Sequence, residues 1–224
     1  MSPCHGCHAG CCRSFVVPVT GADLLHLERA RGLPLEEIVC RWADAEGRIA
    51  RGAAPHFRFE DDLETPYVIG LRHVPSEAHP GTSRCEFLME TPPTPEAPLG
   101  GARCGVYENR PMACRIYPAR FNSTSELTIL SDVPRSGREH EHPAYQLCPR
   151  PWQPEDVDPL ELPRTMAAAK FEREFFRSVA RLWNDVPRAF ADLPDFFRWV
   201  YDNRVWSEAP ATTLPHPAAI RRAA

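Results

Sequence analysis

The sequence predicts an α+β fold, with a small irregular core of short strands, flanking helices and a helical segment near the C-terminus. Segments rich in β-branched and aromatic residues occupy the middle of the chain, and apolar residues recur at helical spacing towards both ends. The 25 prolines among 224 residues favour short elements joined by many loops. We therefore expect a loop-rich protein rather than a regular layered one.

The first helix is predicted to begin at Thr20, after an extended run at residues 15–19. Thr20 is a favourable N-cap, and Asp23 stands at the position that completes a weak capping box. Gly32 follows the last apolar residue of the pattern and is expected to end the helix.

A second helix is predicted over residues 33–47, with Pro34 in its first turn and Gly47 at its end. It should pack against the first helix as a hairpin. Cys40 falls on the apolar side of this predicted helix, which favours a buried core thiol over a metal ligand.

Short strands are predicted between about residues 51 and 132. They correspond to four segments with alternating, β-branched or aromatic residues: HFRFE, PYVIGLRHV, CEFLME and LTIL. The segment TPPTPEAPLGG is too rich in proline and glycine for regular structure, so we expect a surface loop there.

Two further helices are predicted at residues 163–185 and 194–206. The longer one should bury a single apolar stripe, which consists of Met166, Phe171, Phe175, Val179 and Leu182. The expected organisation is a domain over residues 1–150, a helical segment over 151–206 packed on it, and a disordered tail over 207–224.

Eight of the nine cysteines form a pattern that is typical of metal binding. They are Cys4, Cys7, Cys11, Cys12, Cys85, Cys104, Cys114 and Cys148. Thiolates are soft ligands for zinc and for iron–sulfur clusters, and a Cys-x2-Cys pair can place two sulfurs on one ion. A local cluster with distant partners predicts a metal-organised core, which closes only when the distant segments fold back.

Two arrangements of these ligands remain open: two four-cysteine zinc sites, or one iron–sulfur cluster held by four of the thiolates. Cys11 and Cys12 are adjacent and point in different directions in most backbone conformations, so they more easily serve two sites or two irons. His5 and His8 are more often bystanders than ligands in such a position. A thiol–disulfide protein is disfavoured, because the βαβ context of a redox motif is missing.

Charge and hydropathy exclude several classes of partner. A formal net charge of −4 and a pI near 6.1 give no reason to expect nucleic acid. No apolar run has the length of a membrane span, and the first residues lack the apolar region of a signal peptide. We expect a cytoplasmic protein, in which cysteines are more often metal ligands than structural disulfides.

Arginines adjoin several of the cysteines and could donate N–H groups to metal-bound sulfur. Arg110 is the most suggestive, since Pro111 should fix its backbone near Cys114, and Arg115 follows Cys114 directly. Both arginines are therefore candidate residues beside a bound metal.

The N-terminal CHGCHAGCC, the segment CEFL, the element CGVYENRPMACRIYP and the final Cys148-Pro149 together resemble the YkgJ family of zinc- or iron-chelating cysteine-cluster proteins. The resemblance covers roughly residues 4–149. It implies a bound iron–sulfur cluster or Zn²⁺ with the eight cysteines as its ligands. The long proline-rich loop between Cys85 and Cys104 departs from the family's shorter turn.

The cysteines are also similar to those of flagellin lysine-N-methylases, which use an iron–sulfur cluster and S-adenosylmethionine. An iron–sulfur-dependent methyl transferase is therefore one alternative function, although no glycine-rich strand-to-helix turn for that cofactor is present. A zinc-stabilised structural or interaction module is the other. The sequence identifies no catalytic residue, substrate or protein partner.

Overall fold

The chain folds into helices and short antiparallel strands, so the predicted α+β class is confirmed. The computed structural model describes residues 9–50, 54–98, 100–117, 119–121, 128–130 and 154–206. The α-helices are α1 (Gly10–Ser14), α2 (Gly21–Arg31), α3 (Leu35–Ile38), α4 (Met112–Ile116), α5 (Glu161–Asp185) and α6 (Leu193–Trp206). Single 3-10 turns are η1 (Tyr107–Asn109), η3 (Pro154–Asp156) and η4 (Phe190–Asp192).

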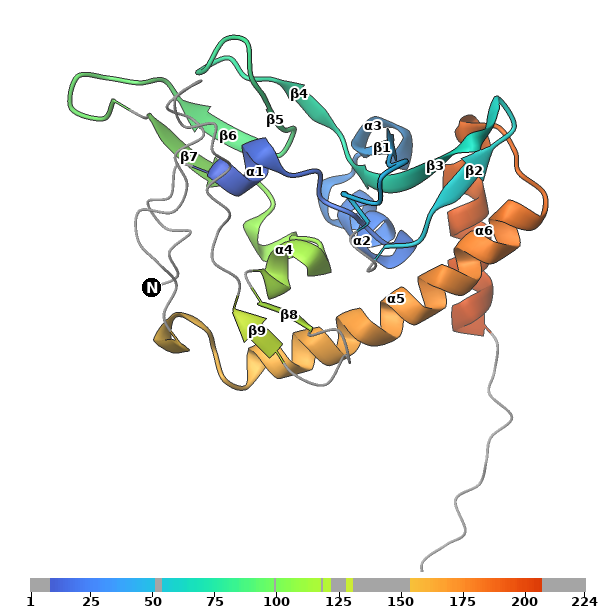
Figure 1. Cartoon of the computed structure of the whole chain (residues 1–224). Helices are drawn as coiled ribbons and strands as arrows, with labels where there is room; N and C mark the ends of the chain where they lie inside the picture. The colour runs from blue at the N-terminus through green and yellow to red at the C-terminus, as the bar shows by residue number, and fades with distance from the viewer. Residues whose placement is uncertain are drawn as a thin grey trace, which may run out of the picture.

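The strands form one small sheet and three hairpins, all antiparallel. The strands are β1 (Val39–Ala43), β2 (Phe57–Phe59), β3 (Asp62–Leu71), β4 (His73–Pro75), β5 (Ser83–Cys85), β6 (Leu88–Thr91), β7 (Gly101–Cys104), β8 (Ala119–Phe121) and β9 (Thr128–Leu130). The sheet has the order β1-β3-β2, and the hairpins are β4-β5, β6-β7 and β8-β9. In Figure 1 the sheet lies on the same side of the molecule as α2, α3 and α6, while α1 and α4 lie among the hairpins. Helix α5 runs from the hairpin β8-β9 and α4 to the sheet and α6 (Figure 1).

The hydrophobic core lies where α2, the three-stranded sheet, α5 and α6 meet. Its fully buried side chains come from all of these elements and include Leu24, Leu27, Phe57, Phe59, Phe176, Trp183, Leu193 and Phe197. The rings of Phe59 and Trp183 meet edge to face with centroids 5.7 Å apart, an arrangement that aromatic pairs favour. Residues far apart in the sequence therefore share one core.

The first predicted helix is confirmed, and the second is wrong beyond its first turn. Thr20 caps α2 with the full capping box, and Gly32 ends it in the left-handed conformation. Helix α3 stops at Ile38, and the chain continues as β1, where Cys40 lies opposite Gly70 of β3. The expected helical hairpin does not form, because pairing with β3 outweighs the local helical pattern. Cys40 is consequently a half-buried strand residue.

The remaining predicted strands and helices appear at or near the expected positions, but the buried face of α5 differs from the prediction. Met166 and Val179 are buried as expected, whereas Phe171 is 71% exposed and Leu182 is 49% exposed. The buried face instead consists of Met166, Ala169, Glu172, Phe176, Val179, Ala180 and Trp183. The predicted loop of residues 91–101 contains an exposed stretch between β6 and β7, and the predicted tail 207–224 lies outside the described residues.

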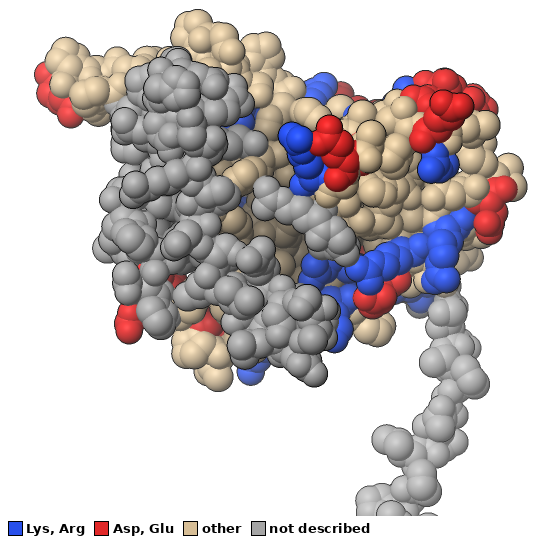
Figure 2. All heavy atoms as spheres, in the orientation of Figure 1, with Lys and Arg blue, Asp and Glu red and all other residues tan. Residues whose placement is uncertain are grey.

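Helix α5, with 25 residues, is the longest helix in the described part of the chain. Basic side chains gather near it on the face shown in Figure 2. On this helix Arg177 pairs with Glu174 at 2.5 Å. Within the part of the chain that the structure describes, no helix combines the length and the apolar character needed to cross a membrane.

Candidate metal centre

Five of the eight predicted metal ligands lie in described residues, on four separate segments. Cys11 and Cys12 are in α1, Cys85 ends β5, Cys104 ends β7 and Cys114 is in α4. The other three predicted ligands, Cys4, Cys7 and Cys148, and the candidates His5 and His8 lie outside the described residues.

The Cys85 turn is held by backbone hydrogen bonds. The backbone N–H of Phe87 donates to the Cys85 sulfur, an interaction that stabilises the thiolate. From the preceding position, Arg84 Nη1 donates to the carbonyls of Glu86 at 3.1 Å and Leu88 at 2.7 Å. One arginine therefore fixes the turn on which the Cys85 sulfur sits.

The Cys104 turn packs directly onto the Cys85 turn. Cys104 lies opposite Leu88 in the β6-β7 hairpin, and the N–H of Gly105 donates to the Phe87 carbonyl at 2.8 Å. A Cβ atom at Gly105 would lie only 3.0 Å from that carbonyl oxygen. Glycine therefore permits the close approach of the two cysteine-bearing turns.

Helix α4, which bears Cys114, is anchored to α2. The backbone N–H of Met112 donates to Asp23 Oδ1 at 2.9 Å, and the same carboxylate caps α2 through Thr20. The first turn of α4 closes through the N–H of Cys114, which donates to the Pro111 carbonyl at 2.9 Å. One buried aspartate thus sets the position of α4 relative to the core.

Four of the cysteines lie close enough to influence one another electrostatically. Burial raises the pKa of Cys114 well above its usual value, and the nearby Cys85, Cys11 and Cys104 raise it further, in that order. Burial also raises the pKa of Cys85 to about 11, with Cys104 as a neighbouring charge. Arg110 acts in the opposite direction and lowers the pKa of Cys114. Four distant segments therefore direct thiols to one region.

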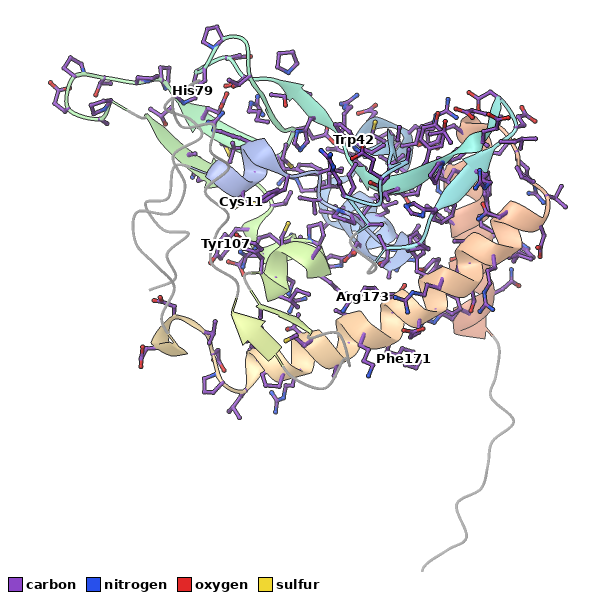
Figure 3. All side chains as sticks on the ribbon, in the orientation of Figure 1. Cys11, Trp42, His79, Tyr107, Phe171 and Arg173 are labelled. Atoms are coloured by element: carbon purple, nitrogen blue, oxygen red, sulfur yellow. The ribbon has the colours of Figure 1, made fainter. Side chains whose placement is uncertain are left out.

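The adjacent cysteines of α1 each share surroundings with other proposed ligands. Cys11, labelled in Figure 3, is among the residues that influence Cys114. Cys12 packs against the hydrophobic core, to which Cys85 belongs and against which Cys104 also packs. That the two adjacent thiols do not share one ion stays a prediction.

The donor set fits a soft, thiophilic metal. Thiols that raise one another's pKa would repel one another as thiolates, and a bound cation offsets that repulsion. The sulfurs of Cys11, Cys85, Cys104 and Cys114 are of the type that zinc and iron–sulfur clusters prefer. Among the described residues alone, no three histidine, cysteine, aspartate or glutamate side chains are grouped so as to hold a metal ion.

The two predicted arginines occupy different positions. Arg110 stacks on the Tyr107 ring, 3.8 Å from its centroid, and Arg110 Nε donates to the Tyr107 carbonyl at 2.9 Å. Arg115 is exposed in the last turn of α4. Of the two, Arg110 lies close enough to Cys114 to lower its pKa. A role for either arginine in metal binding stays a prediction.

Three residues around this centre were not identified from the sequence as part of it. Asp23 was recognised only as a helix cap, and its bond to Met112 joins residues far apart in the chain. Gly105 directly follows Cys104, and that adjacency was a usable signal. Glu90, described below, has no sequence signal because its partners come from three segments.

A family model named CxxCxxCC and described as "Putative zinc- or iron-chelating domain" matches residues 3–141 of the chain. This range contains seven of the eight predicted ligands and excludes Cys148. No curated protein and no solved structure shows significant similarity to the chain.

Proposed function

Because this chain belongs to the CxxCxxCC family of zinc- or iron-chelating domains, we propose that it binds zinc or an iron–sulfur cluster through its clustered cysteines. The proposed ligands are Cys4, Cys7, Cys11, Cys12, Cys85, Cys104, Cys114 and Cys148. Bound metal would join segments from both ends of the domain, so metal binding and folding are expected to be coupled.

The observation that supports this proposal most strongly is the convergence of four cysteines from α1, β5, β7 and α4. Cys114 is influenced by Cys85, Cys11 and Cys104, although at least nine residues of sequence lie between it and each of them. The close packing of the Cys85 and Cys104 turns through Gly105 supports the same grouping. Thiols brought together from four segments can supply several sulfur ligands to one metal centre.

Zinc and iron–sulfur clusters would give different chemistry at these ligands. Zinc in a closed four-cysteine site has no redox activity and supplies folding energy. An iron–sulfur cluster would transfer electrons at a potential set by hydrogen bonds to its sulfurs. Two sites, or a cluster with more than one metal, would accommodate the adjacent Cys11 and Cys12, since adjacent side chains point in different directions in most backbone conformations.

The test is the metal and sulfide content of the full chain purified without oxygen. Brown protein with acid-labile sulfide indicates an iron–sulfur cluster, and colourless protein with bound zinc indicates zinc sites. Chelation under reducing conditions should then lower the melting temperature substantially. Metal-free protein that melts like the loaded protein would refute the proposal that metal organises the fold.

A matched pair of cysteine variants tests the ligand assignment. Cys114→Ser removes a thiol that lies among three others, whereas Cys40→Ser alters a half-buried thiol on β1 outside that group. We expect reduced metal stoichiometry for Cys114→Ser and the parent stoichiometry for Cys40→Ser. Equal losses in both variants would show that the ligand set is wrong.

A further inference from the structure

A buried carboxylate joins the two segments that bear Cys12 and Cys85. Glu90 lies on β6, and its side chain is only 6% exposed. It forms ion pairs with Arg13 Nη1 of α1 and, at 3.0 Å, with Arg84 Nε of β5. Three charged side chains from three elements therefore meet inside the protein.

The Glu90 carboxylate is fully supplied with donors. Ser76 Oγ donates to it at 2.7 Å, and the backbone N–H groups of Glu77 and Ala78 donate at 3.2 and 3.4 Å. Burial alone would raise the pKa of Glu90, but the hydrogen bonds and the charge of Arg13 lower it below its usual value. Glu90 is thus built to remain an anion.

Each arginine of this group adjoins a proposed metal ligand. Arg13 follows Cys12 in α1, and its Nη1 also donates to Ser76 Oγ at 3.1 Å. Arg84 precedes Cys85 and, as described above, bonds the carbonyls of the turn that follows. Helix α1 also packs against β5. The Glu90 carboxylate is therefore the shared partner of two cysteine-bearing segments.

We propose that Glu90 is a positioning residue for the metal centre, which holds α1 with Cys11 and Cys12 at a fixed distance from the Cys85 turn through Arg13 and Arg84. This inference rests on the proposed function. The group also has an excess positive charge, since two arginines surround one carboxylate. The buried Arg13 Nε–H has no hydrogen-bond partner among the described residues, and donors of this kind stabilise metal-bound thiolates.

The first experiment compares Glu90→Gln with Glu28→Gln by titrating Co²⁺ into the metal-free full chain against a chelator. Glu28 is the matched control because it also pairs with an arginine of another element, Arg198 of α6, at 2.6 Å, and does not adjoin any cysteine. Loss of a residue that orients ligands typically weakens metal binding by about 10- to 100-fold. We expect a loss in that range and a changed Co²⁺ absorption spectrum for Glu90→Gln, and parent values for Glu28→Gln. Parent affinity and spectrum for Glu90→Gln would overturn the proposal.

A second variant separates positioning from stability, because Glu90→Gln leaves two buried arginines without their anion and can fail to fold. Arg13→Met cuts the link to α1 and leaves Glu90 paired with Arg84, so neither remaining charge loses its partner. We expect thermal stability close to that of the parent, with weakened Co²⁺ binding. Parent Co²⁺ affinity in Arg13→Met would mean that the ion pair does not position α1 for metal binding, and would overturn the proposal.

A metal-independent readout distinguishes failure of this inference from failure of the proposed function. The Phe15 amide donates to the Cys11 carbonyl at 3.0 Å at the end of α1. If α1 is held by Glu90, hydrogen exchange of this amide in metal-free protein should be faster in Arg13→Met and unchanged in Glu28→Gln. Unchanged exchange in Arg13→Met overturns the restraint on α1. A parent chain that binds no metal refutes the proposed function, and the exchange data still decide the restraint.

Discussion

Replacing Asp23 by asparagine should weaken both the fold and metal binding, because one carboxylate serves two helices. Asp23 Oδ2 accepts hydrogen bonds from the backbone N–H of Thr20 at 3.0 Å and from Thr20 Oγ1 at 3.1 Å. Its Oδ1 accepts the Met112 N–H at 2.9 Å, at the start of the helix that bears Cys114. The first contacts concern α2 alone, whereas the last one concerns the proposed metal centre.

The expected magnitude follows from the number of acceptors. Asparagine offers one side-chain oxygen, so either the Thr20 N–H or the Met112 N–H is left without its partner in a buried place. A buried donor without a partner costs about 1–3 kcal/mol. Burial raises the pKa of Asp23, against the hydrogen bonds from Thr20 and Met112, so removing the charge returns part of this loss. We therefore expect a net destabilisation of about 1–2 kcal/mol.

Thr20→Ala is the matched control, because it removes the α2 cap but leaves Asp23 able to bind Met112. It should lower the free energy of unfolding by about 1 kcal/mol. The assays are urea unfolding of the metal-free protein and chelator competition for metal. We expect Asp23→Asn to reduce both stability and metal affinity, and Thr20→Ala to reduce stability alone. Equal metal affinity for the two variants would refute the role assigned to Asp23 in placing α4.

Two further predictions concern the core and its pH dependence. Gly21→Ala would place a Cβ atom in steric conflict with Cε2 of the buried Tyr201 ring. This substitution should lower the free energy of unfolding by about 1–3 kcal/mol, although alanine normally favours helices over glycine. An unchanged or higher melting temperature would contradict this prediction. For Asp44, burial would raise the pKa, but the His56 ring nitrogen at 3.0 Å and the backbone donors lower it below 3.8. The stability that the Asp44 carboxylate contributes to the fold is therefore present above that pH. It is lost as the pH falls through the lowered pKa. The difference in unfolding free energy between parent and Asp44→Asn should therefore shrink below about pH 4, and a difference that stays constant from pH 6 to pH 3 would contradict the assignment.

The parts of the fold that were predictable from sequence are those that local interactions determine. The beginning of α2 follows from Thr20 and Asp23, which make their capping bonds within three residues of each other. The end of α2 follows from Gly32, whose left-handed conformation suits glycine. Both signals lie within the helix that they delimit, so no knowledge of tertiary packing was required.

The predictions from sequence were wrong where contacts with a distant segment determine the local structure. Residues 39–43 have a pattern compatible with a helix, but they form β1 because β3 is available as a pairing partner. On α5, sequence hydrophobicity favoured Phe171, yet the helix buries Glu172 instead, which receives hydrogen bonds from Tyr201 and Arg204 of α6. Neither partner could be inferred from the sequence near the residue that it affects.

At the candidate site, too, sequence predicts the local features and misses the contacts between distant segments. Cysteine spacing predicts the chemistry of the proposed ligands, because thiolates are soft ligands for zinc and for iron–sulfur clusters. It does not indicate what holds the ligands in place. The Asp23 bond to Met112 and the Glu90 pairs with Arg13 and Arg84 connect segments whose proximity exists only in the folded chain.

The C-terminal helices lie outside the matched residues 3–141, yet they contribute to the structure on which the cysteines depend. Trp183 Nε1 of α5 donates to the Arg58 carbonyl at 2.7 Å, and Asn184 Nδ2 donates to the His56 carbonyl at 2.9 Å, so α5 completes the β2 edge of the sheet. The same helix packs against α4, which bears Cys114. Since α5 contacts both the core and the Cys114 helix, the matched segment alone would lack one of the supports of its own cysteine cluster.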